Sequence, residues 1–219
     1  MIAKNSNNYY KFQVITDEGN IPDRTHLEIA TAGCEGGATL IQFRDKQSSS
    51  LRMYEVAREI RKITRKKKVC FIINDRLDLA MAVDAEGVHL GQTDLPIQIA
   101  RHIWGKDKIY GASASNLEEL NKAIKDGADY IGFGPIYGGR IVYEVKPDAA
   151  SPSGIEVLKK AVSTTTIPII GIGGITEENI EEVIQAGVKG IAVVAAVAWA
   201  EDMKEAASRL RNIIDLNLP

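Results

Sequence analysis

The sequence predicts an α/β protein built as a single (β/α)8 barrel, the TIM-barrel fold. Short, apolar, β-branched runs alternate with amphipathic, helix-like stretches along nearly the whole 219-residue chain. The runs are apolar almost throughout, as in residues 69–73, which is typical of parallel strands that are covered on both faces. No linker rich in proline, glycine or serine divides the chain. Eight such units in about 200 residues favour one closed barrel.

An open, doubly wound sheet is the alternative architecture for the same alternation. Its phosphate-binding G-x-G-x-x-G motif at the start of the first helix is missing from this sequence. Glycine-containing phrases such as residues 127–129 and 187–190 close one helix and open the next strand at once, as tight αβ loops do. We therefore expect an N-terminal tail over residues 1–10 and one barrel domain over residues 11–219.

The predicted elements follow one another in a regular order. The expected strands span residues 11–16, 39–44, 69–74, 87–90, 108–113, 130–133, 167–171 and 190–194. Helical patterns between them span residues 51–64, 117–126, 155–162 and 177–185. Gly127, Gly154 and Gly187 stand where the chain must reverse direction. A last amphipathic stretch, residues 206–216, is expected to pack against the barrel.

Composition and charge exclude several classes of protein. Hydrophobic residues make up 45% and charged residues 26% of the chain, which excludes general disorder. Lys+Arg 27 against Asp+Glu 29 gives a formal charge of -2, so nothing favours nucleic acid or an anionic membrane as a partner. One basic run lacks interleaved aromatic residues and is interpreted as a solvated helix face. It comprises Arg58, Arg61, Lys62, Arg65, Lys66, Lys67 and Lys68.

Several features bear on the compartment. Residues 1–10 are rich in asparagine and lack the apolar core of a secretion signal. The longest apolar run, residues 191–200, is far shorter than the roughly 20 residues of a membrane span. The only cysteines, Cys34 and Cys70, are expected to be buried hydrophobes, without a disulfide framework or a metal cluster. We therefore expect a cytoplasmic protein.

Two carboxylates are expected at the reactive face, which this fold builds from the carboxyl ends of its strands. Asp75 and Asp94 follow neighbouring predicted strands. Close like charges are unfavourable unless a cation lies between them, and oxygen ligands without His or Cys favour a hard ion such as Mg2+. Each aspartate also has a structural alternative: Asp75 capping the next helix, and Asp94 opening a turn before Leu95.

Two cations are expected at the same face. Arg44 and Lys46 follow the second predicted strand, where their side chains reach the mouth of the barrel. Arginine offers a planar fork for phosphate oxygens, and lysine offers a point charge. The alternative is that Arg44 pairs with a local carboxylate such as Asp45, a contact that contributes only about 0–1 kcal/mol when it is solvated.

A glycine-rich turn and two alanines follow the seventh and eighth predicted strands. They are the segments 171–174 and 195–196. Glycines let backbone N–H groups face an anion, and a following helix N-terminus adds partial positive charge, so a phosphate cup is expected here. The alternative is that the glycines only make a tight turn.

The histidines have plainer interpretations. His26 and His102 fall on helical stretches and are expected at the surface or in packing. His89 falls within the fourth strand and is expected to pack beneath the site, with a polar contact to ligand left open. No pair of nucleophile and base stands out.

Several motifs together resemble the thiamine-phosphate synthase family over nearly the whole chain after the tail. They are Gln42-x-Arg44-x-Lys46, Ile72-Ile73-Asn74-Asp75-Arg76, Gly87-Val88-His89-Leu90-Gly91-Gln92-x-Asp94, Gly127-Ala128-Asp129-Tyr130-Ile131-Gly132, Gly134-Pro135-Ile136 and Ile170-Gly171-Ile172-Gly173-Gly174-Ile175. The resemblance implies a transferase that joins hydroxymethylpyrimidine diphosphate to thiazole phosphate and releases pyrophosphate. It also implies small-molecule substrates, and a homo-oligomer is compatible with it.

The resemblance implies roles for particular residues. Asp75 and Asp94 would hold Mg2+ on the diphosphate. The pyrimidine diphosphate would be held by Gln42, Arg44, Lys46, Asn74 and Ser113, and the thiazole phosphate by Gly174 and the backbone around Val194 and Ala195. The implied catalytic set is Arg44, Lys46, Ser113 and Lys146. Fixed cations that bind a departing diphosphate lower the barrier to a dissociative, carbocation-like path.

The sequence departs from the family pattern at two places. A Thr-x-Thr-Lys segment usual after the sixth strand is replaced by residues 137–149, and the best registration places Lys146 on the family lysine, with Arg140 as the alternative cation. Ala195 stands where a serine is usual. Two other functions are kept as alternatives. A related thiazole tautomerase would carry a histidine near Ser115, and a non-catalytic binder would keep only the phosphate cup.

Overall fold

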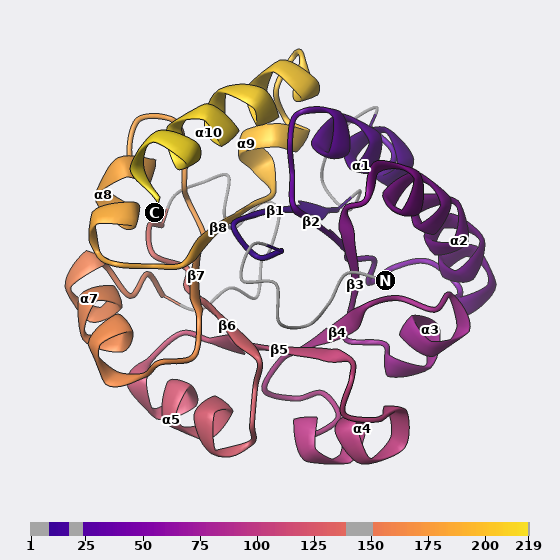
Figure 1. Ribbon diagram of the computed structural model, residues 1–219, viewed down its shortest axis with the longest axis horizontal. Helices are drawn as coiled ribbons and strands as arrows, with labels where there is room; N and C mark the ends of the chain where they lie inside the picture. Colours follow the sequence, from indigo (N-terminus) through magenta and orange to yellow (C-terminus); the bar gives the residue numbers. More distant parts are fainter. Residues whose placement is uncertain (1–8, 18–23, 139–150, 219) are drawn as a thin grey trace.

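The computed structural model describes residues 9–17, 24–138 and 151–218. In this part of the chain, eight parallel strands pair in the order β1 to β8 and close into a barrel, with the helices outside it (Figure 1). The strands are β1 Phe12–Thr16, β2 Leu40–Phe43, β3 Cys70–Asn74, β4 Gly87–Leu90, β5 Ile109–Ala114, β6 Tyr130–Phe133, β7 Ile169–Ile172 and β8 Gly190–Val193. The predicted (β/α)8 barrel is confirmed.

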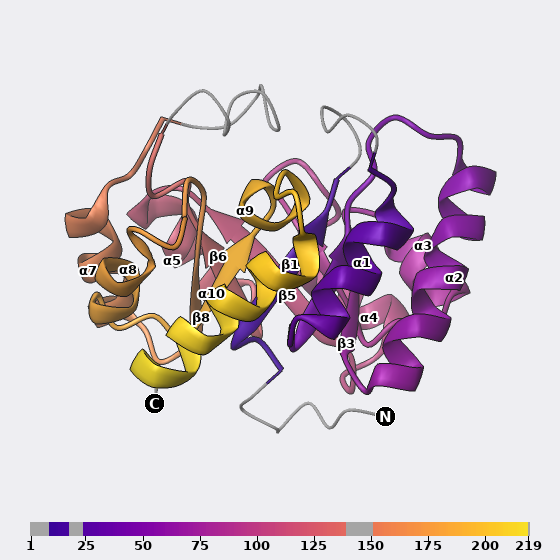
Figure 2. The same ribbon diagram turned by 90° about the horizontal axis from the view of Figure 1, so that it is seen from above.

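The helices form one layer around the strands, with α7 and α8 on the opposite side of the barrel from α2 and α3 (Figures 1 and 2). They are α1 His26–Glu35, α2 Ser50–Lys67, α3 Leu77–Ala82, α4 Ile97–Trp104, α5 Leu117–Lys125, α7 Ile155–Thr164, α8 Ile180–Gln185, α9 Ala195–Ala198 and α10 Met203–Asn217.

Local hydrogen bonds explain where several helices begin. Thr25 and Glu28 form a capping box at the start of α1, which satisfies two otherwise unpaired N–H groups. The predicted helix over 177–185 begins later than expected, at Ile180. The Asn179 side-chain oxygen accepts the Thr176 N–H at 2.9 Å, so these residues form a turn ahead of the helix.

Apolar side chains fill the barrel from both sides of its wall. One cluster lies between the strands and the helices, and a smaller one fills the interior of the barrel. Tyr9 and Tyr10 belong to the interior cluster, although the predicted tail contained them. They lie at the amino ends of the strands, where the Tyr10 carbonyl approaches Gly190 at the start of β8. The packed structure therefore includes at least these two residues of the predicted tail.

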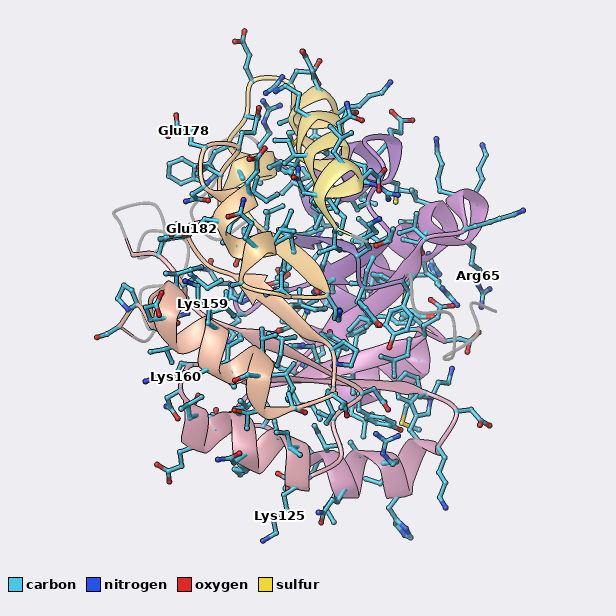
Figure 3. The ribbon with its side chains drawn as sticks, turned by 60° about the vertical axis from the view of Figure 1, so that its left-hand side comes forward. Arg65, Lys125, Lys159, Lys160, Glu178 and Glu182 are labelled. Carbon is cyan, nitrogen blue, oxygen red and sulfur yellow. The ribbon has the colours of Figure 1, made fainter. Side chains whose placement is uncertain are left out.

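Charged side chains project outward from the helical layer, among them Lys125, Lys159 and Lys160 (Figure 3). Most of the basic run on α2 is exposed as expected. Arg61 is the exception, because it is only 7% exposed and its guanidinium donates to both carboxylate oxygens of Glu86 at 2.6 and 2.7 Å. The expectation of a continuous solvated face is wrong at this residue, which ties α2 to the segment before β4.

Both cysteines, Cys34 and Cys70, are free and buried, as predicted. Among the described residues, none of the helices combines the length and the apolar character that crossing a bilayer requires.

Candidate active site

Three predicted site residues from separate loops meet at the carboxyl ends of β2, β3 and β4. The Lys46 Nζ lies 3.3 Å from the Asp75 Oδ2. The Asp75 carboxyl also shares a hydrogen bond with Asp94. Because β2, β3 and β4 are consecutive in the barrel, their last residues lie at one edge of the mouth. The sequence analysis predicted this convergence of two carboxylates and one ammonium group.

The backbone at both aspartates is specialised. Asp75 has a φ of 62°, in the left-handed region that few non-glycine residues occupy. Its N–H donates to the His89 carbonyl of β4 at 2.8 Å. Asp75 is not the cap of α3, because Arg76 holds that position without a side-chain hydrogen bond. The structural alternative for Asp75 is therefore wrong.

The structural alternative for Asp94 holds in part. Its Oδ2 accepts the Gly91 N–H at 2.6 Å and so closes the turn after β4. The same carboxylate faces Asp75, so the turn and the contact with Asp75 coexist. The turn fixes the direction of the Asp94 carboxylate without using its second oxygen.

The electrostatics of the pair indicate a place for a cation. Burial raises the pKa of Asp75 above its ordinary value, and the hydrogen bond and charge of Asp94 raise it further, while Lys46 opposes the change. A divalent ion would relieve this repulsion. No group of three or more metal-ligating side chains is present in residues 9–17, 24–138 and 151–218. One or two carboxylates, with water and phosphate oxygens completing the shell, is how proteins commonly bind Mg2+.

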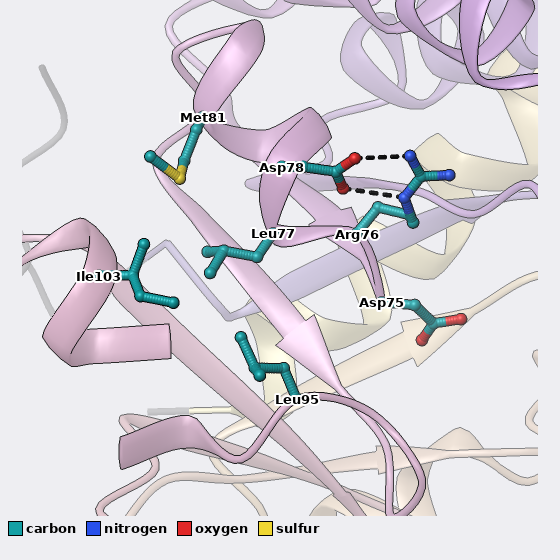
Figure 4. A pocket seen from close by; sticks show the side chains of 7 residues that line it. All are labelled: Asp75, Arg76, Leu77, Asp78, Met81, Leu95 and Ile103. Carbon is teal, nitrogen blue, oxygen red and sulfur yellow. Dashed lines mark hydrogen bonds and ion pairs between the residues drawn. The ribbon is translucent and has the colours of Figure 1, made fainter. Parts of the chain in front are cut away.

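A cavity of about 390 Å³ lies beside this cluster, outside the barrel mouth (Figure 4). Its walls are largely apolar and come from the segment between β3 and α3, from α3 itself, from the loop before α4 and from α4. The lining residues are Asp75, Arg76, Leu77, Asp78, Met81, Leu95 and Ile103. Figure 4 shows the Asp75 carboxylate directed away from Leu77, Leu95 and Ile103. Asp75 therefore lies at the edge of this cavity, with its carboxylate turned away from the apolar wall.

Arg44 is held by a different partner from the one considered in the sequence analysis. Its guanidinium pairs with Asp17, directly after β1. The backbone N–H of Arg44 donates to the Thr16 carbonyl at 3.2 Å. Asp45 points elsewhere and lies 3.6 Å from the His26 Nε2. The alternative of an Arg44–Asp45 pair is therefore wrong. Asp17 was not predicted, because nothing in the local pattern of β1 relates it to a residue 27 positions later.

A buried polar network forms the floor of the mouth. Ser113 of β5 and the His89 Nε2 lie 2.9 Å apart, and the His89 Nδ1 shares a hydrogen bond with the Tyr130 hydroxyl at 2.9 Å. Gln42 of β2 also contacts the Tyr130 hydroxyl. The Gln42 side chain is buried, and its Nε2 has no hydrogen-bond partner among the described residues. A buried amide N–H without a partner is costly, so an acceptor on a ligand fits here.

Space for this network comes from a glycine. A Cβ on Gly111 would collide with the Tyr130 ring and the His89 Nδ1, so β5 must carry glycine at this register for the two side chains to meet. The expectation that His89 packs beneath the site is confirmed, since it is only 8% exposed. Its polar contacts on both ring nitrogens, and the role of Tyr130, were not predicted.

The glycine turn after β7 lies against the loop that follows β6. Gly174 has a φ of 69°, and a Cβ there would lie 2.8 Å from the Tyr137 carbonyl oxygen. The Gly174 carbonyl accepts a hydrogen bond from the Asn179 side chain at 2.9 Å. These contacts require glycine for the turn itself, which gives Gly174 a structural role. The predicted phosphate binding by the same turn stays a prediction.

The remaining predicted residues complete the rim. Asn74 is the last residue of β3, and Val194 and Ala195 follow β8 and begin the short helix α9. Ile172 and Ala192 are paired across β7 and β8, and Gly174 and Val194 each follow their member of this pair by two positions, at the same end of the barrel. Lys146 and the alternative cation Arg140 lie outside the described residues.

The fold and the arrangement of this end of the barrel together define a TIM-barrel enzyme. Acidic, basic and glycine residues gather at the carboxyl ends of its strands, where such enzymes bind their substrates. Comparison with known proteins identifies the particular family. The family model described as thiamine monophosphate synthase matches residues 12–197, and the chain belongs to this family.

Similar proteins cover almost the same length. A thiamine-phosphate synthase of Chloroflexus aurantiacus is 44% identical over 207 residues, which is 94% of each chain. One of Clostridium novyi is 42% identical over 204 residues, covering 93% of this chain and 98% of the other. The solved structure of a thiamine phosphate pyrophosphorylase from Pyrococcus furiosus superposes with a TM-score of 0.86 at 40% identity, covering 97% of this chain and 99% of that one.

Proposed function

We propose that the protein joins hydroxymethylpyrimidine diphosphate to thiazole phosphate, giving thiamine phosphate and pyrophosphate. Its similarity to thiamine-phosphate synthases over nearly the whole chain supports this reaction. The observation that carries the proposal is the contact of Lys46, Asp75 and Asp94 at one edge of the mouth. Two carboxylates suit a metal ion, and a neighbouring ammonium group suits the diphosphate that the ion would bind.

Asp75 and Asp94 are proposed to hold Mg2+, which would neutralise negative charge on the departing diphosphate. The donor set fits, because two carboxylates face each other here and both burial and the neighbouring Asp94 raise the pKa of Asp75. Lys46 lies within 3.3 Å of one of them and is placed to bind a diphosphate oxygen on the same side. Its side chain is 48% exposed, so it is free to turn from Asp75 toward a ligand.

The other predicted residues take complementary parts in this proposal. Arg44, oriented by Asp17, would bind the diphosphate with Asn74 at the end of β3. Gln42 and Ser113 would face the pyrimidine from the floor. There the Gln42 Nε2, which has no partner among the described residues, could donate to an acceptor on the pyrimidine. The thiazole phosphate would lie at the other side of the mouth, against the groups proposed for it: Lys146, Gly174, Val194 and Ala195.

The proposed path is dissociative. The C–O bond to the diphosphate breaks, both bonding electrons leave with the oxygen, and the thiazole nitrogen supplies the electron pair for the new C–N bond. The residues of the chain would act by holding the two reactants in line and by excluding water, and the proposed path uses no covalent nucleophile from the protein. Fixed cations at the diphosphate stabilise charge as it develops there.

One assay tests the reaction against its alternatives. Purified protein receives both substrates and Mg2+, and pyrophosphate and thiamine phosphate are quantified with and without EDTA. Equal amounts of both products, lost with EDTA, support the transferase. Isomerised thiazole without coupling would instead support the tautomerase, and substrate binding with no product would support a non-catalytic binder.

The described geometry favours the transferase over the tautomerase. At the position where a tautomerase would carry a histidine, Ser115 donates from both its N–H and its hydroxyl to Glu119, at 2.7 and 2.9 Å. This side chain therefore supports the start of α5. A cytoplasmic location, the absence of nucleic-acid partners and a homo-oligomeric state stay predictions.

A further inference from the structure

Three consecutive residues after β2 are bound to three different parts of the barrel. Arg44 pairs with Asp17 after β1, and Lys46 pairs with Asp75 after β3. Asp45, between them, turns the opposite way and faces α1. Two residues proposed to bind the diphosphate are thus separated by one that binds the scaffold. Asp45 is therefore the residue of the three whose side chain is directed at the helical layer.

The two oxygens of Asp45 have separate partners. Its Oδ1 accepts the N–H groups of Gln47 at 2.9 Å and Ser48 at 3.0 Å, which folds the loop back on itself. Its Oδ2 lies 3.6 Å from the Nε2 of His26. The side chain of Asp45 is only 6% exposed. Burial raises the pKa of Asp45, but these backbone hydrogen bonds and His26 outweigh it and leave the pKa below its ordinary value.

His26 is fixed on every side that the structure describes. It is the first residue of α1 and 1% exposed, and the capping box of Thr25 sets the start of this helix. The His26 Nδ1 shares a hydrogen bond with the Thr16 hydroxyl at 2.9 Å. Its ring packs edge-on against Phe43, with the centroids 4.8 Å apart. Thr16 and Phe43 are paired across β1 and β2, so His26 is anchored to the barrel wall itself.

We propose that His26 is a positioning residue for the diphosphate end of the site. Through Asp45 it would hold the loop so that Arg44 and Lys46 both face the mouth. The proposal rests on the proposed function, because it concerns the same diphosphate. Misplacing a binding group by about 1 Å is enough to cost a large factor in rate, so a rigid anchor behind the loop has a clear physical use.

Two amide substitutions separate the two contacts of His26. In His26→Gln the longer side chain reaches toward Asp45, as the Nε2 does. In His26→Asn the shorter side chain reaches only toward Thr16, as the Nδ1 does. Both replace a buried ring by a neutral amide at the same position. If His26 serves folding alone, His26→Gln should weaken pyrophosphate binding as much as His26→Asn or more. If His26 acts through Asp45, His26→Asn should weaken it and His26→Gln should not.

The first measurement is calorimetric titration with inorganic pyrophosphate and Mg2+. We expect His26→Asn to weaken pyrophosphate binding about tenfold and His26→Gln to keep it within about threefold, because only His26→Asn loses the contact that orients the loop. Steady-state rates should show the KM for the pyrimidine diphosphate raised by the same factor. The KM for the thiazole phosphate should stay within about twofold of wild type. Equal losses in both variants, or a joint rise of both KM values, would overturn the proposal.

Asp45→Asn provides a second route if His26→Asn does not fold. Its Oδ1 still accepts the Gln47 and Ser48 N–H groups, so the loop keeps its turn while the charge toward His26 is lost. The same weakening of pyrophosphate binding is expected, and the double variant should bind no more weakly than either single one. Additive losses would contradict the proposal. His102→Asn, at an exposed position on α4, is the control and should bind as wild type does.

The binding measurement keeps this proposal distinct from the proposed function. If the wild-type protein binds pyrophosphate but couples no substrates, the function fails while His26 can still be judged from pyrophosphate affinity. If coupling occurs and His26→Asn binds pyrophosphate normally, the positioning role fails and the function stands.

Discussion

The two sides of the barrel mouth are built in different ways. Around β2, β3 and β4, side chains make the site: Lys46 and Asp94 both contact Asp75, and the buried pair of Asp45 and His26 lies behind the loop that carries Lys46. Around β7 and β8 the chain offers backbone, with Gly174 packed against Tyr137 and Ala195 at the start of a short helix. The first side is organised by paired charges and the second by close approach of main chain.

This difference teaches where each kind of substitution acts. On the charged side a side chain can be exchanged for a near-isostere without disturbing the fold, so chemistry and stability separate. On the glycine side the turn and the proposed binding surface are the same atoms, so a change in one alters the other. The following predictions run from the largest expected effect to the smallest.

Asp75→Asn should cost the most. It removes one of the two proposed Mg2+ ligands while keeping the shape of the side chain, and we expect turnover to fall on the order of a thousandfold or more. Pyrophosphate release at saturating substrates and Mg2+ measures it. The variant should also lose the rise in melting temperature that Mg2+ with pyrophosphate gives the wild type by mass action.

Asp78→Asn is the matched control for this prediction. Asp78 lies three positions further on, binds Arg76 at 2.6 Å, and is 67% exposed. Its loss should change turnover less than about twofold, as for most exposed positions. Near-normal turnover in Asp75→Asn would show that Asp75 is not a Mg2+ ligand. The claim that the charged side can lose chemistry without losing stability would then fail.

Lys146→Ala should slow coupling by about a hundredfold, the range seen when one donor to developing charge is lost. Arg140→Ala should slow it only a few-fold. Both residues belong to the segment after β6. Comparing the two variants therefore tests which of the two cations acts on the thiazole phosphate at the glycine side. The comparison of the two rates under identical conditions decides it, and the reverse ranking would show that the family registration of this segment is shifted.

Gly174→Ala should raise the KM for thiazole phosphate about tenfold and destabilise the protein by about 1–3 kcal/mol, because an alanine there is strained and meets Tyr137. Gly127→Ala is the control, since Gly127 has a similar φ of 80° but open space around its Cβ position. We expect Gly127→Ala to lower the melting temperature without changing either KM. A Gly174 variant that loses stability alone would mean that the turn is structural only.

Ala195→Ser should have the smallest effect. It supplies the hydroxyl usual in the family, and one further hydrogen bond to a phosphate is expected to lower the KM for thiazole phosphate about threefold. Ala196→Ser, at the adjacent half-buried position, should leave that KM unchanged. An increase in KM for Ala195→Ser would indicate that this side of the mouth has been reshaped around alanine.

The sequence was sufficient for the architecture and for the charged cluster. The apolar strand runs predict the barrel. Consecutive parallel strands necessarily bring the residues that follow them, such as Lys46, Asp75 and Asp94, to one edge of the mouth. The late start of α8 was missed because a side-chain turn at Asn179 competes with the helix, and that competition is local but not periodic. Periodicity alone cannot report it.

Contacts between distant segments could not be predicted in the same way. His26 was expected in ordinary packing, and only the folded position of α1 brings it to Asp45. Arg61 was expected in solvent, yet it forms a buried ion pair with Glu86, 25 positions away. The Gln42–Tyr130–His89 floor likewise requires three non-adjacent strands to face one interior. Such contacts depend on the register between elements, which a single sequence does not encode in any short window.

Tyr9 and Tyr10 lie buried beneath the amino ends of the strands. Because their rings help to fill that end of the described barrel, the pyrimidine diphosphate would enter, and pyrophosphate would leave, at the opposite end. Pyrophosphate that has not yet diffused out would occupy the site at which the next pyrimidine diphosphate binds. Clearance of that by-product, for instance by an enzyme that hydrolyses it to inorganic phosphate, would then govern how quickly successive cycles can start.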